Sequence, residues 1–146
     1  WSAVIIGAGF SGIDAAIKLK NLGIPFVIIE KSEKQGGTRW DNQYPGAACD
    51  VPSHLYSLSY YLNPWWTRAF SRQEEIRDYL EDVVSKFGLR SYIQFNTRVL
   101  TADWDEASSQ WVIKAENGGE FRGNFLFSAA GGLHVPNDTR FKGIKR

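Results

Sequence analysis

Residues 3–12 read Ala-Val-Ile-Ile-Gly-Ala-Gly-Phe-Ser-Gly, a short apolar run that leads directly into spaced glycines. The β-branched run predicts a buried parallel strand, and the apolar spacing over residues 13–17 predicts one face of a helix. A second apolar run, residues 26–29, ends at Glu30. These segments predict a compact strand–helix–strand unit of the size typical of a dinucleotide-binding half-fold.

The glycines and the acid of this unit have the chemistry of a nucleotide site. Gly7 permits a tight turn, Gly9 lets the backbone approach a pyrophosphate, and Gly12 lets helix and strand pack closely. The N-terminus of the helix offers N–H groups and a partial positive charge to phosphates. Glu30 can accept hydrogen bonds from ribose hydroxyls and would repel a 2′-phosphate, which favours FAD or NAD over NADP. The alternative is a glycine turn needed only for packing.

Residues 31–70 show no periodic pattern, yet they are too rich in aromatic side chains for a solvated linker. They therefore predict an ordered, functional loop. Ser71-Arg-Gln-Glu74 is a capping-box signature, in which Ser71 accepts the Glu74 N–H and Glu74 reaches back. It predicts a helix that ends at Gly88.

The remainder predicts the rest of a sheet. A short strand is expected near residues 92–95, and the apolar run at 125–127 predicts a strand that returns to the sheet. Antiparallel strands are expected at residues 97–104, 110–116 and 119–122. The fold class is therefore α/β: a Rossmann-like FAD/NAD(P)-binding fold with a doubly wound parallel sheet and a small antiparallel β-meander insertion at about 97–123.

Composition limits the function classes. The chain has 146 residues, 43% of them hydrophobic, enough for one domain with a core. With 17 basic and 16 acidic residues it has a net charge of +1, which argues against nucleic acid or acidic membranes as partners. No apolar run approaches the ~18 residues of a spanning helix. The single cysteine, Cys49, fits a reducing, cytoplasmic compartment. No metal site is expected.

The chain begins at Trp1 and contains no methionine. We therefore expect residues 1–146 to be the N-terminal part of an FAD-binding domain, incomplete as it stands, with the NADPH-binding domain and the remainder lying outside this chain.

Residues 36–50 form the most distinctive part of the long loop. Gly36 and Gly37 can expose backbone amides, and either Arg39 or Trp40 could lie along a planar ring system. Asp50 ends a run of small neutral residues, so we expect it to be partly buried and to need a partner, as site acids do. The alternative is that the aromatics belong to the core and that Asp50 caps a helix at residues 52–55.

Taken together, residues 4–12, 36–57 and 128–133 resemble the class B flavin monooxygenases. Within that class the chain is most similar to the Baeyer–Villiger monooxygenases, which share the pattern Gly-Gly-Thr-Trp…Asn-x-Tyr-Pro-Gly-x-x-Cys-Asp. The resemblance covers essentially the whole chain and implies FAD as the cofactor. It implies that the ADP half of FAD is held by Gly7, Gly9, Ser11, Gly12 and Glu30. It implies that the flavin is surrounded by Gly37, Thr38, Arg39, Trp40, Asp41, Asp50 and Tyr56, with the backbone of Val99 at the adenine.

The resemblance also implies a reaction. NADPH reduces FAD, O2 is captured as a C4a-peroxyflavin, and this species attacks a ketone, or another organic substrate, to give an ester or lactone. Asp50 is implied as the catalytic acid, beside the isoalloxazine and paired with an arginine from a later domain. That arginine and the glycine-rich motif for NADPH do not occur in this chain, so this segment alone is not expected to turn over.

Other functions stay open at this point. A flavin-dependent N- or S-oxygenase and a non-catalytic, truncated FAD-binding module both fit the residues. A disulfide reductase needs a cysteine pair, and Cys49 stands alone. The chain departs from the family where Arg39 takes the place of Trp and Trp40 follows it, which would weaken cofactor binding or shift its redox behaviour. His54 and His134 are expected to be loop or surface residues.

Overall fold

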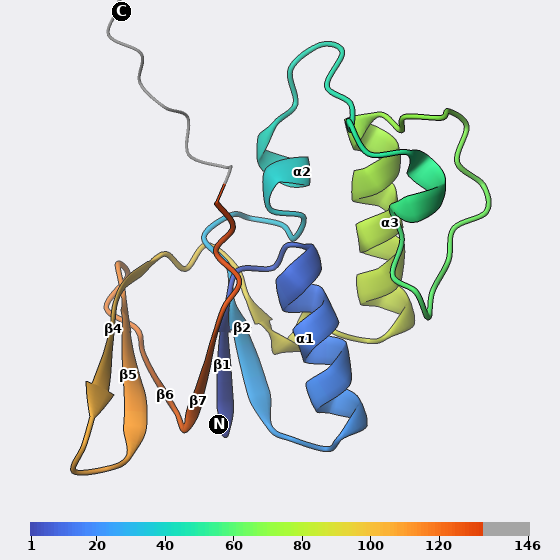
Figure 1. Ribbon diagram of the computed structural model, residues 1–146. Coiled ribbons are helices and arrows are strands. Elements are labelled where there is room, and N and C mark those ends of the chain that lie inside the picture. The colour runs from blue at the N-terminus through green and yellow to red at the C-terminus, as the bar shows by residue number, and fades with distance from the viewer. Residues whose placement is uncertain (133–146) are drawn as a thin grey trace, which may run out of the picture.

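The computed structural model describes residues 1–132 and shows a parallel sheet between helices and a small antiparallel sheet (Figure 1). The parallel sheet has the order β3-β2-β1-β7. Its strands are β1 (Ala3–Ile6), β2 (Phe26–Ile29), β3 (Ile93–Gln94) and β7 (Phe125–Ser128). Ile5 lies opposite Ile28 on one side and Phe127 on the other. The predicted α/β fold with a parallel Rossmann-like sheet is confirmed.

Two long helices end at glycines, as their sequences predict. Helix α1 (Phe10–Asn21) is followed by Gly23 with φ +68°, and helix α3 (Gln73–Lys86) is followed by Gly88 with φ +59°. Both glycines take the left-handed conformation that commonly stops a helix, because a residue without Cβ adopts it without strain.

The start of α3 differs from the capping-box prediction, which is wrong. Arg72 is the N-cap residue, and its side chain makes no capping hydrogen bond. Ser71 is buried and its Oγ instead lies 2.6 Å from the Oγ of Ser53. Arg72 is extended because it forms an antiparallel bridge with Ala48. Pairing with the long loop therefore takes the backbone and side chain that the capping box would have used.

The long loop contains little regular structure, as expected. It includes the short helix α2 (Thr38–Asp41) and a 3₁₀ turn η1 (Ser53–Leu55); a second such turn, η2 (Arg90–Tyr92), precedes β3. Pro52 is the N-cap residue of η1 and no side chain caps it, so the alternative role of Asp50 as a helix cap is not found.

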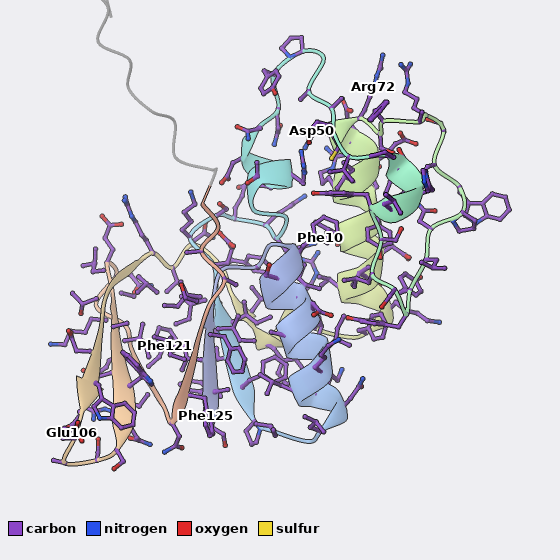
Figure 2. The ribbon with its side chains drawn as sticks, in the orientation of Figure 1. Phe10, Asp50, Arg72, Glu106, Phe121 and Phe125 are labelled. Carbon is purple, nitrogen blue, oxygen red and sulfur yellow. The ribbon has the colours of Figure 1, made fainter. Side chains whose placement is uncertain are left out.

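The meander insertion is confirmed and covers the second face of the parallel sheet. Its strands are β4 (Val99–Asp105), β5 (Gln110–Ala115) and β6 (Glu120–Gly123), all antiparallel. Ile113 is fully buried against Val4, Val27 and Ile29, and Phe121 packs against the same cluster between the two sheets (Figure 2). Within residues 1–132, no helix is long and apolar enough to cross a membrane.

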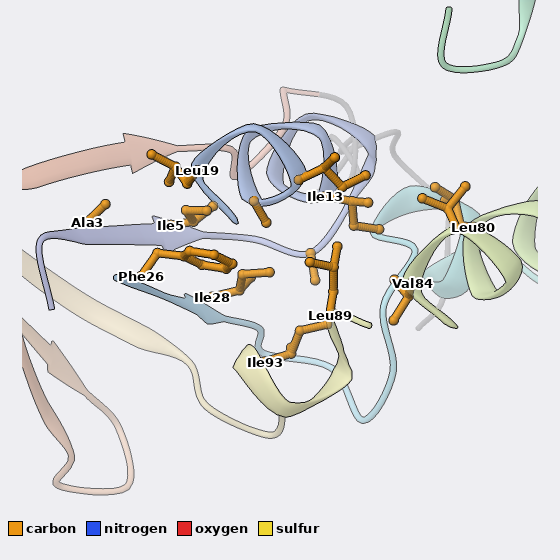
Figure 3. Close-up of a cluster of buried hydrophobic side chains, with 14 of the residues drawn as sticks. Ala3, Ile5, Ile13, Leu19, Phe26, Ile28, Leu80, Val84, Leu89 and Ile93 are labelled. Atoms are coloured by element: carbon orange, nitrogen blue, oxygen red, sulfur yellow. The ribbon is translucent and has the colours of Figure 1, made fainter. Parts of the chain in front are cut away.

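The main core lies on the helical face. Ile13 of α1 and Leu80 of α3 pack with Ile5 and Ile28 of the sheet, and Leu89 closes the cluster (Figure 3). All five are fully buried. Each contributes about 1.5–3 kcal/mol of apolar burial. This core fixes the carboxyl ends of β1 and β2, where the candidate site lies.

Candidate dinucleotide-binding site

A pocket of about 710 Å³ opens at the carboxyl ends of β1, β2 and β7. The chain runs from β1 outward to β2 and β3, and then returns to the opposite side of β1 as β7. Ligands of open α/β sheets bind at such a reversal of strand order. The pocket thus occupies the position that the fold class favours for a nucleotide.

The glycine turn has the geometry that close backbone packing demands. A Cβ on Gly12 would lie 1.9 Å from the carbonyl oxygen of Gly7, and a Cβ on Gly7 would lie 2.5 Å from that of Ala129. Gly9 differs, because the nearest atom to its built Cβ is the Cα of Gly37 at 3.9 Å. Packing within the protein therefore explains Gly7 and Gly12, whereas Gly9 borders open space in the pocket.

Gly37, in the long loop, lies next to Gly9 in the pocket wall. Its φ is +55°, and a Cβ there would lie 3.4 Å from the Cα of Gly9. The N–H of Gly36 donates to the carbonyl oxygen of Ala8 at 2.9 Å, which fastens the loop to the glycine turn. Two backbones without side chains therefore approach each other closely in the wall of the pocket.

Glu30 is held rigidly at one side of the pocket. It is only 3% exposed, and its Oε2 accepts the N–H of Ala8 at 2.7 Å while Oε1 accepts that of Ser32 at 2.8 Å. A carboxylate has about four acceptor positions, so capacity remains for a ribose hydroxyl. Val99 lies on the same side, because the N–H of Thr97 donates to the carbonyl oxygen of Glu30 at 2.9 Å.

Arg39 and Tyr56 form a further part of the pocket wall. The Nη2 of Arg39 donates to the phenol oxygen of Tyr56 at 3.0 Å and to the Sγ of Cys49 at 3.4 Å. The ring of Phe10 meets the Tyr56 ring edge-on, with centroids 5.0 Å apart. Burial lowers the pKa of Arg39, but the hydrogen bond to Tyr56 and the nearby Cys49 and Asp50 outweigh it, so the pKa is raised above its ordinary value.

Asp41 is fixed by the segment that follows β2. Its Oδ1 accepts the hydroxyl of Ser32 at 3.1 Å, and its Oδ2 lies 3.4 Å from the Nζ of Lys31. Asp41 therefore lies at the edge of the pocket with its charge already paired.

The structure brings most of the predicted cofactor residues together around this pocket. The predicted residues that line it are Gly7, Gly9, Ser11, Glu30, Gly37, Thr38, Arg39, Asp41, Tyr56 and Val99. Gly12 is buried beneath the turn. Trp40 lies outside the pocket, with the Nζ of Lys34 5.2 Å from its ring centroid.

Asp50 departs from its expectation. It is exposed and not partly buried, and the contact found for its carboxylate is with the Sγ of Cys49, 4.0 Å from Oδ1. Its neighbour Cys49 turns inward and is 5% exposed, so Asp50 turns outward. Figure 2 shows Asp50 between α2 and the start of α3.

Sequence reasoning missed several pocket residues. Phe10, Lys31, Thr97 and Arg98 also line the pocket. Phe10 stands inside the glycine motif, and Thr97 and Arg98 precede Val99, so adjacency to predicted residues was the available signal. His54 is exposed in the loop, as expected, and His134 lies outside the described residues.

Comparison with known proteins assigns the family. A family model described as pyridine nucleotide-disulphide oxidoreductase matches residues 4–146. The chain belongs to this family. Despite the family's description, the curated relatives reported below are monooxygenases, and the single cysteine of the chain cannot form a redox-active pair within it.

Within the pyridine nucleotide-disulphide oxidoreductase family, the chain is similar to Baeyer–Villiger monooxygenases, which confirms the resemblance noted from the motifs. A Baeyer–Villiger monooxygenase of Streptomyces coelicolor is 45% identical over 141 residues, covering 96% of this chain and 27% of that protein. One from Pseudomonas aeruginosa is 44% identical over 142 residues, covering 97% of this chain and 27% of that protein. The chain thus spans 27% of the length of these relatives.

Solved structures agree. Cyclohexanone monooxygenase from Rhodococcus sp. Phi1 bound to NADP⁺ superposes with a TM-score of 0.91 at 38% identity, covering 95% of this chain and 27% of that one. Oxidized steroid monooxygenase bound to NADP superposes with a TM-score of 0.90 at 36% identity, covering 98% of this chain and 28% of that one.

Proposed function

We propose that this chain is the N-terminal, FAD-binding portion of a longer NADPH- and O2-dependent monooxygenase that converts ketones to esters or lactones. The observation that carries the proposal is a pocket lined by Gly9 and Gly37, at the N-terminus of α1 and at the reversal of strand order. The similarity to Baeyer–Villiger monooxygenases over almost the whole chain supports the choice of cofactor and reaction.

The residues present fit FAD. The pocket beside Gly9 suits a pyrophosphate, because a residue without a side chain lets phosphates approach the backbone and the amides at the start of α1 would bind them. Glu30 and the backbone of Val99 would hold the adenosine on one side. On the other, Tyr56 and Arg39 would border the flavin. The pocket volume of about 710 Å³ also lies in the range of cofactor sites.

FAD, when bound, supplies the electron transfer and the activation of O2. The chain's own residues would bind the cofactor, orient it and place charge around it. Asp50 is our candidate for the acid of the reacting site, since it follows Cys49, which contacts Arg39 in the pocket wall. Its exposure leaves it accessible to groups from the remainder of the proposed longer protein, including the arginine that the resemblance implies.

The test uses the natural protein that contains this chain. We expect it to purify with a bound flavin spectrum and to consume NADPH faster when a ketone is added, with the ester or lactone detected by mass spectrometry. Absence of flavin binding would contradict the cofactor assignment. Oxygenation of amines or sulfides only, with ketones inert, would contradict the Baeyer–Villiger assignment and favour an N- or S-oxygenase.

A further inference from the structure

The guanidinium of Arg39 lies at a defined place in the pocket wall. Its Nε and Nη2 lie 3.3 and 3.0 Å from the phenol oxygen of Tyr56, and its Nη2 also lies 3.4 Å from the Sγ of Cys49. A side-chain amide of Gln73, in the first turn of α3, donates to the Arg39 carbonyl oxygen. Backbone and side chain are thus both anchored, so the position of the charge is set before any ligand binds.

This charge is not neutralised locally. Within residues 1–132, Arg39 forms no ion pair with a carboxylate. Asp41, its neighbour in α2, is already engaged by Lys31 and Ser32. Asp50 is near enough to favour the charged form of Arg39 but is exposed, where solvent screens it. A fixed and largely uncompensated positive charge therefore borders the pocket.

The location of Arg39 selects the part of FAD that it would meet. The proposed function puts the pyrophosphate in the pocket beside Gly9, at the N-terminus of α1, and the adenosine beside Glu30 and Val99. Arg39 lies in the part of the pocket wall formed by Tyr56, to which it is hydrogen-bonded, and Phe10, whose ring meets that of Tyr56. Flat aromatic walls suit the planar flavin ring, so the cation borders the redox-active end of the cofactor.

We propose that Arg39 raises the reduction potential of the bound flavin by stabilising the negative charge that reduction places on the ring. This inference rests on the proposed function. A hydride from a dihydronicotinamide delivers two electrons and one proton to the neutral oxidised ring, which leaves the ring with one negative charge. A nearby cation favours that charged form over the neutral one, and a partly desolvated site strengthens the effect.

The experiment compares the affinities of the two redox states of FAD in the natural protein and in Arg39→Met. Each protein, stripped of cofactor, is titrated with oxidised FAD and, anaerobically, with reduced FAD. By thermodynamic linkage the ratio of these affinities gives the shift in potential, even for a variant that binds FAD weakly. We expect the ratio of reduced to oxidised affinity to fall about tenfold, which equals about 30 mV for a two-electron couple.

Two further variants make the result specific. Arg39→Lys keeps the charge and is expected to keep most of the ratio. Arg90→Met removes the charge of an exposed arginine outside the pocket and is expected to leave the ratio unchanged. If Arg39→Met weakens both redox states equally, Arg39 acts on the phosphates or on packing, and the proposal is overturned. If the natural protein binds no FAD at all, it is the proposed function that fails.

Discussion

Gly9 and Gly37 pack against each other in the pocket wall, and a Cβ on Gly37 would lie 3.4 Å from the Cα of Gly9. The first glycine belongs to the glycine turn and the second to the long loop, so two segments that are distant in the sequence approach closely at residues without side chains. Within the glycine turn, Gly12 is needed for packing, whereas a Cβ on Gly9 would meet no protein atom closer than 3.9 Å. The first two predictions test this difference between folding and ligand binding.

Gly9→Ala should fold normally and bind FAD poorly. The φ of Gly9 is −82°, which alanine adopts, and the built Cβ meets no protein atom closer than 3.9 Å. We expect the free energy of unfolding to change by no more than about 1 kcal/mol, as for substitutions at helix starts. FAD affinity should fall at least about tenfold, since a side chain at Gly9 would hinder the close approach of the pyrophosphate to the backbone. Denaturation and FAD titration of the same preparation measure both; unchanged affinity would contradict this placement.

Gly12→Ala should destabilise the fold itself. Its Cβ would lie 1.9 Å from the carbonyl oxygen of Gly7, which is backbone and cannot move aside without distorting the turn. We expect a loss of about 3 kcal/mol in the free energy of unfolding, at the upper end for overpacking. Urea denaturation measures it. A variant as stable as the natural protein would show that α1 and β1 are not packed as closely as described.

Glu30→Gln should destabilise the turn. Both carboxylate oxygens accept backbone N–H groups, from Ala8 and Ser32, and the amide that replaces one oxygen would face a donor with a donor. We expect a loss of about 1–3 kcal/mol, the cost of a buried unsatisfied group. The variant should also discriminate less against a 2′-phosphorylated nucleotide, which competition binding would detect. Full retention of stability would mean that Glu30 serves the ligand only.

Asp50→Ala should leave FAD bound and suppress oxygenation in the natural protein. The side chain is exposed and does not line the pocket, so removing it costs little in folding or in cofactor affinity. We expect the flavin content to be unchanged and ester formation to fall at least about tenfold, a typical loss for a residue that places charge at a reacting site. Loss of FAD would instead assign Asp50 a structural role.

The contact between the long loop and α3 at Glu75 should stabilise the fold less as the pH falls. A hydrogen bond from the N–H of Thr67 to Glu75, 3.0 Å long, lowers the pKa of Glu75. Because the folded pKa is lower than the unfolded one, this contribution is present above the ordinary value of about 4.3 and is lost as the pH falls through the folded value. It should amount to less than about 1 kcal/mol for a partly exposed group. In Glu75→Gln, the midpoint of unfolding should therefore fall less steeply as the pH is lowered than it does in the natural protein.

Much of the framework could be predicted from the sequence because local patterns and tertiary structure agree there. The apolar run before Gly7 and the acid after residues 26–29 define the strand–helix–strand unit without knowledge of any partner. Gly23 and Gly88 mark the helix ends for the same reason, since the left-handed turn is a local property. The meander likewise agrees with the three short strands expected at residues 97–104, 110–116 and 119–122.

The errors share one cause, which is competition from residues far along the chain. Ser71 has the pattern of a helix cap, but Ser53, eighteen positions away, takes its hydroxyl. Asp50 has the pattern of a buried acid, but the inward turn of Cys49 toward Arg39 sends it to the surface. Neither the position of the Ser71 hydroxyl nor the exposure of Asp50 can be predicted from local sequence, because both depend on where the long loop contacts the start of α3.

Gln73, in the first turn of α3, is not among the residues that line the pocket, yet its side chain bonds the backbone of Arg39, and its own N–H donates to the carbonyl oxygen of Ala47 at 3.0 Å. The start of α3 therefore holds the loop in position through these two hydrogen bonds. A small change at the start of α3, such as a shift of one hydrogen bond, would move Arg39 and its charge within the pocket wall. A substitution of Gln73 therefore acts on the site without changing any residue that lines the pocket.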